Sequence, residues 1–576
     1  MEIRSDFAID RALVSLEPRV VPFYRFDVLV LGGGAAGCTA ALAAAEAGAA
    51  VGLLTKADIS ESNTLYAQGG VAAVFGPGDT FGSHAADTLE LGCGLSDPDI
   101  VRRVVRGGPE AVEALLAMGT EFDRDATGKL ALSREGGHEH ARVLHARGDS
   151  TGLEIQRALV RGVRGHRGIA LFPHTFAIDL LRDEAGDVCG VLAWTPRGER
   201  VGYLASEVIL ATGGAGQIYR ETTNPSIATG DGVALGFRAG ATVRDLEFFQ
   251  FHPTCLYIAG AARVLISEIV RGAGGVLRDR NGRRFMPDCH RDGELAPRDV
   301  VSRAAFATMV ATEDTSVYLD LSPIQADVHT LFPNISRICG FFGIDIARDP
   351  IPVRPGQHYM VGGLAVDAHG HTGVTGLWAV GECASSGLHG ANRMGSNSLL
   401  EGLVLGVDTG RAAAATALRS RRELRPRGSS NERSSASGLR VNVEDVTYSL
   451  KSLMWRQMGV VRGRAKLEDA LHKIVLWTRA VRELAPDEVR TFELLNMLVV
   501  ARIAVTSALA REESRGVHFR EDFPAPDPAW RAHTEVRGEG SEQRFEALLL
   551  RRVPVATDAA ALTAHGAVVD TPSSLR

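Results

Sequence analysis

The first residues with an evident chemical use are the glycines at positions 32–37. The run Gly32-Gly33-Gly34-Ala35-Ala36-Gly37 stands between an apolar segment, residues 28–31, and a helix-forming segment, residues 35–47. Glycines let the backbone turn tightly and approach a pyrophosphate, and the N-terminus of the next helix offers it N–H groups and partial positive charge. An ordinary glycine turn is the alternative, but the expected strand and helix around the run favour a dinucleotide site.

The next expected strand, residues 50–54, is not followed by the acid that binds the ribose of NAD. Thr55 and Lys56 stand there instead, and a hydroxyl and an ammonium could bind ribose or phosphate. Three further segments favour FAD over NAD. They are a polar loop ending in two glycines (63–70), a glycine pair closing a strand (211–214), and a strand ending at Glu382 followed by a capped helix start (396–402). Together they predict a nucleotide domain in two parts, interrupted by an insertion.

Composition excludes several other kinds of protein. The 576 residues carry a net charge of −6, so a nucleic-acid partner is not expected. The seven cysteines are scattered without a CxxC pair, which argues against a disulfide framework, a zinc site or an iron–sulfur site. Residues 28–45 are uncharged over a length that would suit a membrane span, but they hold four glycines and an alanine-rich half, so no span is expected. With no signal peptide visible, we expect a cytoplasmic protein.

The chain is too long for one domain, because compact cores split beyond about 250–300 residues. Residues 57–150 are predicted to be loop-rich, and residues 443–515 to form a helical bundle on their apolar spacing. No structure is predicted for the terminal segments. The expected domains are an N-terminal extension (1–26), a discontinuous nucleotide-binding domain (27–245 and 361–423), an inserted domain (246–360), a linker (424–438), a helical domain (439–520) and a tail (521–576).

Further motifs occur in order along residues 27–515: Phe251-His252-Pro253-Thr254, Ser267-Glu268, Arg271-Gly272, Ala296-Pro297-Arg298-Asp299, Gln357-His358-Tyr359 and Gly390-Ala391-Asn392-Arg393-Met394. On these motifs the chain resembles the flavoprotein family of succinate dehydrogenase, fumarate reductase and L-aspartate oxidase. The resemblance implies an α/β FAD-binding Rossmann-like domain, an inserted α+β capping domain and a C-terminal helical bundle. It also implies that the chain binds FAD and acts on a small dicarboxylate.

The expected FAD-binding residues are Gly32, Gly33, Gly34, Ala35, Ala36, Gly37, Lys56, Asn63, Thr64, Leu65, Tyr66, Ala67, Gln68, Gly69, Gly70, Asp231, Glu382, Ser398 and Leu399. Family members that form respiratory complexes have a histidine at the position of Asn63, and that histidine links covalently to FAD. An asparagine cannot form this bond. Non-covalent FAD is therefore expected.

The expected catalytic residues follow from the same matches. His252, His358 and Arg393 resemble the carboxylate clamps of the family, with Ser267 and Glu268 nearby, and His138 and His389 are second-rank candidates. Arg298 resembles the family's proton donor and acceptor; because arginine normally stays protonated, a purely electrostatic role is the alternative.

The loop that contains Glu135, Arg134-Glu135-Gly136-Gly137-His138, resembles the loop whose glutamate orients the substrate amino group in the aspartate oxidases. An anion beside an α-ammonium favours aspartate over succinate, because a buried ammonium needs a partner. The alternative for Glu135 is a solvated loop acid.

These features imply oxidation of L-aspartate to iminoaspartate by hydride transfer to FAD, with oxygen or fumarate as the electron acceptor. The reaction would open NAD biosynthesis, with quinolinate synthase as a possible partner. One alternative is a soluble fumarate reductase or a succinate dehydrogenase subunit, against which Asn63 and the Arg134–His138 loop argue. Another is a flavin-bearing assembly subunit without chemistry of its own, which would have no need of the full set of site residues.

Overall fold

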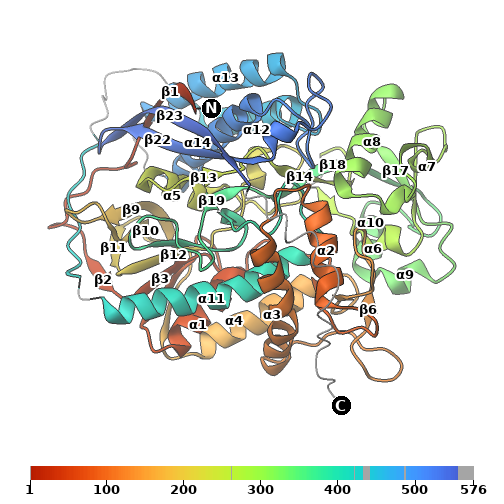
Figure 1. Cartoon of the computed structure of the whole chain (residues 1–576), viewed down its shortest axis with the longest axis horizontal. Coiled ribbons are helices and arrows are strands. Elements are labelled where there is room, and N and C mark those ends of the chain that lie inside the picture. Colours follow the sequence, from red (N-terminus) through yellow and green to blue (C-terminus); the bar gives the residue numbers. More distant parts are fainter. Residues whose placement is uncertain (1, 261–262, 421, 432–440, 485–487, 556–576) are drawn as a thin grey trace.

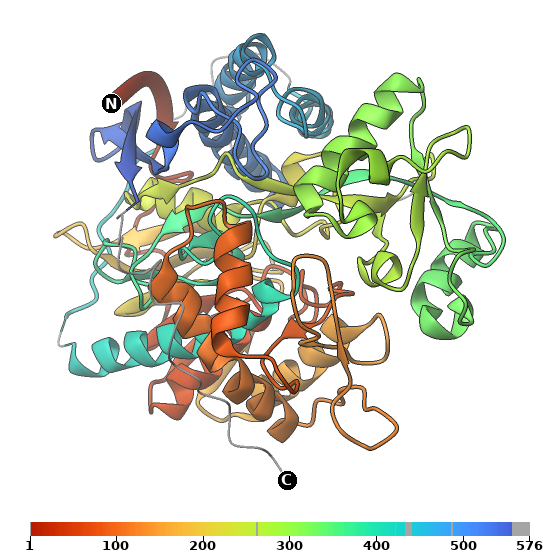
Figure 2. The same ribbon diagram turned by 45° about the vertical axis from the view of Figure 1, so that its right-hand side comes forward.

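The computed structural model describes residues 2–260, 263–420, 422–431, 441–484 and 488–555. Figures 1 and 2 show three lobes: a parallel-sheet lobe built largely from the N-terminal half, a cap lobe (residues 249–360) at the right of Figure 1, and a helical lobe (residues 443–510) above. Residues 432–438 of the expected linker lie outside the described ranges.

The parallel sheet is covered by helices on one face and by a second, mainly antiparallel sheet on the other. Its strands, in spatial order, are β20 (Leu377–Ala379), β12 (Glu207–Leu210), β3 (Val28–Leu31), β4 (Val51–Leu54) and β8 (Ile169–Phe172), and all neighbours are parallel. Burial on both faces requires strands that read as continuous apolar runs, as residues 28–31 do. The main covering helices are α1 (Ala35–Glu46), α4 (Thr151–Gly165) and α11 (Asn397–Arg419). Gly410 lets α11 pack directly on α1, because a Cβ there would lie 2.3 Å from the Ala40 carbonyl oxygen.

Residues 57–150 contain more regular structure than their sequence predicts. They form α2 (Phe81–Leu91), α3 (Pro98–Ala117) and a small sheet of β5 (Val71–Ala72), β7 (Val143–Leu144) and β6 (Leu132–Ser133). The sequence does not predict α3, because it contains Gly107, Gly108 and Pro109, and these residue types normally interrupt helices. The glycines instead allow close packing, since Cβ atoms at Gly107 and Gly108 would lie 2.8 Å from Val404 and 3.3 Å from Ala73.

A second, mainly antiparallel sheet lies beside the parallel one (Figure 1). Its strands are β2 (Phe23–Arg25), β11 (Arg200–Leu204), β10 (Val188–Trp194) and β9 (Phe176–Arg182). The short helix α5 (Asp231–Ala239) packs against β9 and α14, so it links this sheet to the helical lobe.

The cap lobe has its own sheet and its own apolar core. The strands are β15 (Val264–Leu265), β14 (Phe249–Leu256), β18 (Ile351–Met360), β17 (Val317–Asp320) and β16 (Val276–Arg278), all antiparallel to their neighbours. Its helices are α6 (Ile269–Gly272), α7 (Met286–Cys289), α8 (Arg298–Ala311), α9 (Val328–Leu331) and α10 (Pro333–Phe341). The chain enters the lobe along β14 and leaves along β18, which pair with each other.

The helical lobe consists of α12 (Val443–Gln457), α13 (Arg464–Arg482) and α14 (Val489–Ala510), as the apolar spacing predicts. Among the helices in the described ranges, α14 alone is long and apolar enough to cross a membrane. However, 89% of its most apolar window is buried inside the protein, which is the position of a core helix.

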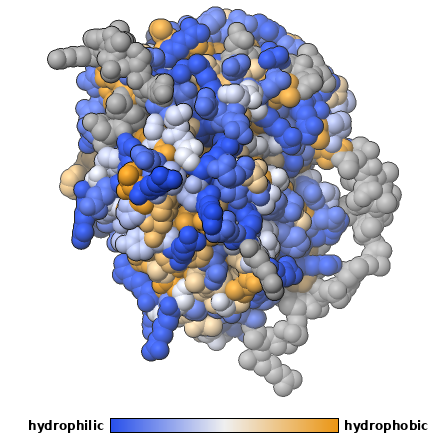
Figure 3. All heavy atoms as spheres, turned by 90° about the vertical axis from the view of Figure 1, so that its left-hand side faces the viewer, coloured by the Kyte–Doolittle hydropathy of each residue, from blue (hydrophilic) through white to orange (hydrophobic). Residues whose placement is uncertain are grey.

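The two terminal segments, for which no structure was predicted, form one edge of a six-stranded sheet. The order is β1 (Glu2–Asp10), β23 (Arg544–Pro554), β22 (Ala532–Gly540), β13 (Val243–Arg244), β19 (Gly363–Ala365) and β21 (Ala384–Ser385). The pairings of β1 with β23 and of β13 with β22 join segments hundreds of residues apart, and local sequence patterns do not predict such pairings. On the face of the molecule in Figure 3, hydrophobic residues are interspersed with hydrophilic ones.

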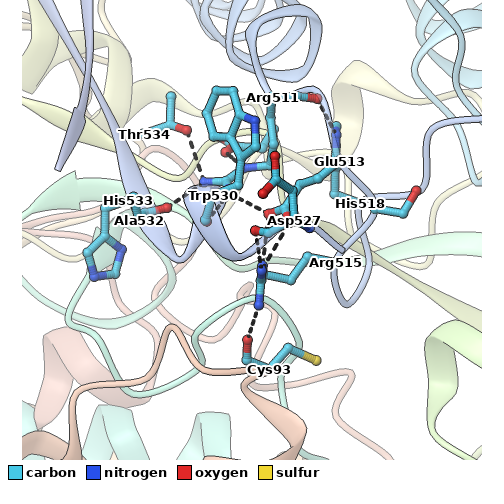
Figure 4. A network of polar contacts seen from close by, with 12 residues as sticks. Cys93, Arg511, Glu513, Arg515, His518, Asp527, Trp530, Ala532, His533 and Thr534 are labelled. Atoms are coloured by element: carbon cyan, nitrogen blue, oxygen red, sulfur yellow. Dashed lines mark hydrogen bonds and ion pairs between the residues drawn. The ribbon is translucent and has the colours of Figure 1, made fainter. Parts of the chain in front are cut away.

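A buried ionic network ties this sheet to the base of the cap lobe (Figure 4). Arg511, which is fully buried, donates through Nε to Glu247 at 2.6 Å and through Nη1 to Glu513 at 2.9 Å. Its Nη2 donates to the Ala532 carbonyl at 2.8 Å and to the Thr534 hydroxyl at 3.0 Å, both on β22. Because Glu247 lies two residues before the start of β14, this network fixes the strand along which the cap begins.

Candidate active site

One cavity runs between the parallel-sheet lobe and the cap lobe and collects almost every residue that the sequence singled out. Of the residues predicted to bind FAD and the first-rank catalytic candidates, all but Gly37 and Leu65 line it. The predicted catalytic residues in its wall are Glu135, His252, Ser267, Glu268, Arg298, His358 and Arg393.

The glycine run forms the tight turn that the sequence predicts. Gly32 has φ +114°, and a Cβ there would lie 2.2 Å from the carbonyl oxygen of Ala211 on the neighbouring strand. Gly37 faces back onto this turn, where a Cβ would lie 2.0 Å from the Gly32 carbonyl oxygen, so its role is packing. The N-cap of α1, Gly34, has no capping side chain. The turn therefore leaves a helix N-terminus open to an anionic group such as a pyrophosphate.

The loop at residues 63–70 lies against the turn and offers polar atoms to the cavity. The Thr64 hydroxyl accepts from the Ala35 N–H at 3.0 Å, and Asn63 Nδ2 donates to Glu382 at 2.9 Å. Asn63 Oδ1 and Gln68 Oε1 are buried without a hydrogen-bond partner in the structure. Unpaired buried oxygens are costly, so these atoms and the glycine turn fit a polar dinucleotide such as FAD.

Lys56 is held by the protein itself. Its ammonium donates to Thr229 at 2.6 Å, to Asp231 at 2.7 Å and to Glu493 of α14 at 2.6 Å. Burial lowers the pKa of Lys56, but the two carboxylates outweigh that effect and the pKa lies above its ordinary value. No acidic residue follows β4 directly. The carboxylates near this strand end are instead Asp231 of α5 and Glu493 of α14, and Lys56 lies between them.

Arg298 and Arg393 form the cationic wall of the cavity on the cap side. Arg298, the first residue of α8, donates through Nε to Glu268 at 2.7 Å. Both arginines place an Nη1 at 3.3 Å from Oε1 of Gln250. Arg393 also lies over the Tyr359 ring at 4.5 Å, and its Nε has no hydrogen-bond partner in the structure. Burial and the nearby Arg298 lower the pKa of Arg393 to about 10, so it remains a cation at neutral pH.

Glu268 keeps its charge although it is buried. Burial raises the pKa of Glu268, but the positive charges of Arg298 and Arg271 together lower it by more. The pKa of Glu268 therefore lies below its ordinary value. Ser267 lines the cavity beside it. Arg298, the ionised Glu268 and Arg271 therefore form a chain of ion pairs from the cavity into the cap lobe.

His252 and His358 lie together, with ring centroids 5.3 Å apart. Burial lowers the pKa of both rings well below the usual value, and Arg298 and Arg393 lower them further. His358 Nδ1 is 2.9 Å from the Thr223 hydroxyl. Both imidazoles are therefore neutral at pH 7 and can each donate one hydrogen bond to a carboxylate.

Glu135 reaches the same part of the cavity from the loop between β6 and β7. It is 2% exposed, its Oε2 accepts from the Ser396 hydroxyl at 2.7 Å, and its Oε1 is buried with no hydrogen-bond partner among the residues that the structure describes. The adjacent Gly136 makes room for Glu268, because a Cβ there would lie 2.2 Å from Glu268 Oε1. Glu135 is thus a buried acid with one oxygen free, not a solvated loop acid.

The second-rank histidines and Phe251 do not line the cavity. His138 Nε2 contacts the Gly395 carbonyl at 3.1 Å, and His389 Nε2 contacts Glu401 at 3.1 Å, so both lie behind the wall. Phe251 packs against Tyr219 and Trp455.

Sequence reasoning missed two residues that organise the site. Gln250 bridges the two cavity arginines, and only its position directly before the Phe251-His252 motif could have indicated it. Ser396 is the first residue of the segment expected to be a capped helix start, but its hydroxyl makes no capping bond to α11 and binds Glu135 instead. Its φ of +63° is unusual for a serine, and such backbone strain is typical of functional positions.

Two family models match the chain. The FAD binding domain matches residues 27–399, and the fumarate reductase flavoprotein C-terminal domain matches residues 447–561. The chain is 44% identical to the L-aspartate oxidase of Streptomyces coelicolor, covering 89% of this chain and 91% of that one. It is 40% identical to the L-aspartate oxidase of Synechocystis, covering 89% and 97%. It is 41% identical to the chloroplastic L-aspartate oxidase of Oryza sativa, covering 89% and 84%.

Solved structures agree with the family models. An E. coli quinol fumarate reductase FrdA variant superposes with a TM-score of 0.85 at 31% identity, covering 93% of this chain and 98% of that one. Mycobacterium smegmatis Sdh1 superposes with a TM-score of 0.80 at 30% identity, covering 93% and 95%. These likenesses confirm the predicted fold class and FAD as the cofactor. The chain therefore belongs to the FAD-dependent flavoprotein family of succinate dehydrogenase, fumarate reductase and L-aspartate oxidase.

Proposed function

We propose that the protein is an L-aspartate oxidase, which converts L-aspartate to iminoaspartate. The observation that carries the proposal is Glu135, a buried acid whose Oε1 lacks a partner beside a wall of carboxylate-binding groups. A dicarboxylate alone gives a site no reason to bury an additional carboxylate, whereas an α-ammonium does. FAD, when bound, accepts the hydride that leaves the substrate Cα.

The two substrate carboxylates are assigned to the cationic wall. Arg298 and Arg393 provide charge, and the neutral imidazoles of His252 and His358 provide directional N–H donors. Gln250 fixes both arginines through one oxygen, so the two cations keep their separation before substrate arrives. These contacts hold the substrate in one orientation, so that its Cα–H bond is already positioned for hydride transfer.

Arg298 is assigned the central catalytic role. It is held by Glu268, which in turn lies 3.5 Å from Arg271. The ionised Glu268 stabilises the guanidinium at the substrate, and the Arg298–Glu268–Arg271 chain offers a route for a proton that enters or leaves at Arg298.

The FAD is assigned a non-covalent mode of binding, because Asn63 donates to Glu382 and has no nucleophilic atom for a flavin linkage. Oxygen or fumarate is proposed as the acceptor that reoxidises it. We further propose a cytoplasmic location and transfer of the imine to quinolinate synthase in NAD biosynthesis. Fumarate reduction or succinate oxidation is the second candidate, favoured by the likeness to the fumarate reductase and Sdh1 structures.

Anaerobic flavin bleaching separates the two candidates. The holoenzyme is mixed with L-aspartate, with succinate or with D-aspartate, and loss of the flavin absorbance band is followed by stopped flow. Rapid bleaching by L-aspartate alone is expected. Bleaching by succinate that is faster than bleaching by L-aspartate would replace the proposal with the second candidate.

A further inference from the structure

The loop that presents Glu135 has little rigidity of its own. It is defined here as the specificity loop, residues 134–139, and it contains Gly136 and Gly137, the latter at φ +85°. Two adjacent glycines leave a backbone with many accessible conformations. Some other part of the protein must therefore hold the Glu135 carboxylate in place.

Helix α2 supplies the contact at the end of this loop, and it lies beside β6 in Figure 1. Asp87 Oδ2 accepts from the backbone N–H of Glu139 at 2.9 Å and from Arg142 Nη1 at 2.6 Å. Arg142 is fully buried, and it binds Asp79 through two hydrogen bonds of 2.8 and 2.9 Å. A doubly bonded guanidinium has a fixed plane, so Asp87 is itself fixed.

A second contact holds the middle of the loop. His138 Nδ1 lies 3.4 Å from Arg142 Nη1, and its Nε2 lies 3.1 Å from the carbonyl oxygen of Gly395. With Arg142 on the Nδ1 side, Nε2 carries the proton and donates to Gly395. Gly395 directly precedes Ser396, whose hydroxyl holds Glu135 Oε2. Arg142 and His138 thus connect the loop to the segment that orients its glutamate.

We propose that Asp87 is a positioning residue for substrate choice, which through Arg142 and the Glu139 backbone fixes Glu135 toward the substrate ammonium. The proposal rests on the proposed function, because it concerns the group that separates aspartate from other dicarboxylates. Asp87 does not line the cavity, so it acts on the substrate only through the loop.

The test is Asp87→Asn in the full-length holoenzyme, with kcat and KM measured for L-aspartate oxidation and for fumarate reduction. The expected result is a loss of about tenfold in kcat/KM for aspartate, because small misplacements of a site group are costly, with less than twofold change for fumarate. Asp99→Asn is the matched control. Asp99 lies on the neighbouring helix α3, is exposed and pairs with Arg102, so both activities should stay at the parental level.

A double variant separates positioning from general stability. In Asp87→Asn combined with Glu135→Gln, the ratio of the two activities should equal that of Glu135→Gln alone, because Asp87 has no other route to the substrate. Equal losses of both activities in the single variant, or additive losses in the double variant, would overturn the proposal. If Asp87→Asn fails to retain FAD, His138→Leu, which removes the donor to the Gly395 carbonyl, tests the same connection with the same expected change in ratio. A parent protein without aspartate oxidation would instead refute the proposed function.

Discussion

Replacing Glu135 by glutamine tests the chemistry of substrate choice most directly. In the structure Oε2 of Glu135 accepts from Ser396, and Oε1 is the free oxygen. A glutamine must keep its carbonyl oxygen toward the Ser396 hydroxyl, because that hydroxyl donates. Its NH₂ then occupies the place of Oε1 and presents a donor to the substrate ammonium.

The expected loss can be estimated from this geometry. A charge-assisted hydrogen bond in a buried site contributes about 1.5–3 kcal/mol, which corresponds to about one to two decades in affinity. Because the glutamine also turns an acceptor into a donor, the loss should lie near the upper limit, or about a hundredfold in kcat/KM for aspartate. Fumarate has no ammonium, so its reduction should change little.

The assay is the ratio of L-aspartate oxidation to fumarate reduction in the variant and in the parent. Glu139→Gln is the matched control, since Glu139 is on the same loop and its side chain is 69% exposed. If the ratio in Glu135→Gln equals that of the parent, Glu135 has no part in recognising the ammonium and the reasoning above fails.

Three further predictions concern the cation at the substrate and the cofactor. Arg298→Ala and Arg298→Lys should nearly abolish turnover while flavin absorbance per protein stays at the parental level, because among the described residues the Arg298 side chain bonds Glu268 and Gln250, neither of which is a predicted FAD-binding residue. Near-normal turnover of the alanine variant would remove Arg298 from the site. Acid precipitation should release all FAD into the supernatant, and yellow colour left in the pellet would contradict non-covalent binding. Glu493→Gln removes one of the two carboxylates on Lys56 and should raise the FAD dissociation constant by about fivefold, since a largely buried ionic hydrogen bond contributes about 1 kcal/mol. Fluorescence of released FAD measures this change, and Glu444→Gln, which alters an exposed pair with Arg490, should leave it unchanged.

The sequence predicts those parts of the site that rest on local rules. The turn at residues 32–37 is an example, because its glycines are required by contacts with the adjacent strand and by the turn itself. The family motifs predicted the cavity residues for a different reason, since each motif carries its own functional side chain. Both kinds of signal are read from a few neighbouring residues.

The residues that were missed act through contacts between distant segments. Gln250 gains its role only when β14 meets the segment of Arg393, 143 positions later. Ser396 has the sequence context of a helix cap, and only the position of Glu135, 261 residues away, gives its hydroxyl another partner. The same limit applies to β1 and β23, whose pairing depends on tertiary packing.

The ion pair between Glu247 and Arg511 has a consequence for how the protein is made. The two residues are 264 positions apart, and the carboxylate of Glu247 is fully buried in the finished structure. At a synthesis rate of about 5–20 residues per second, Arg511 follows Glu247 by roughly 13 to 53 s. During that time, burial of Glu247 would leave a charge without its partner, which is strongly unfavourable. Until translation has passed residue 511, the base of the cap lobe therefore lacks the cation that pairs with Glu247, and we expect the catalytic cavity to be completed only near the end of synthesis.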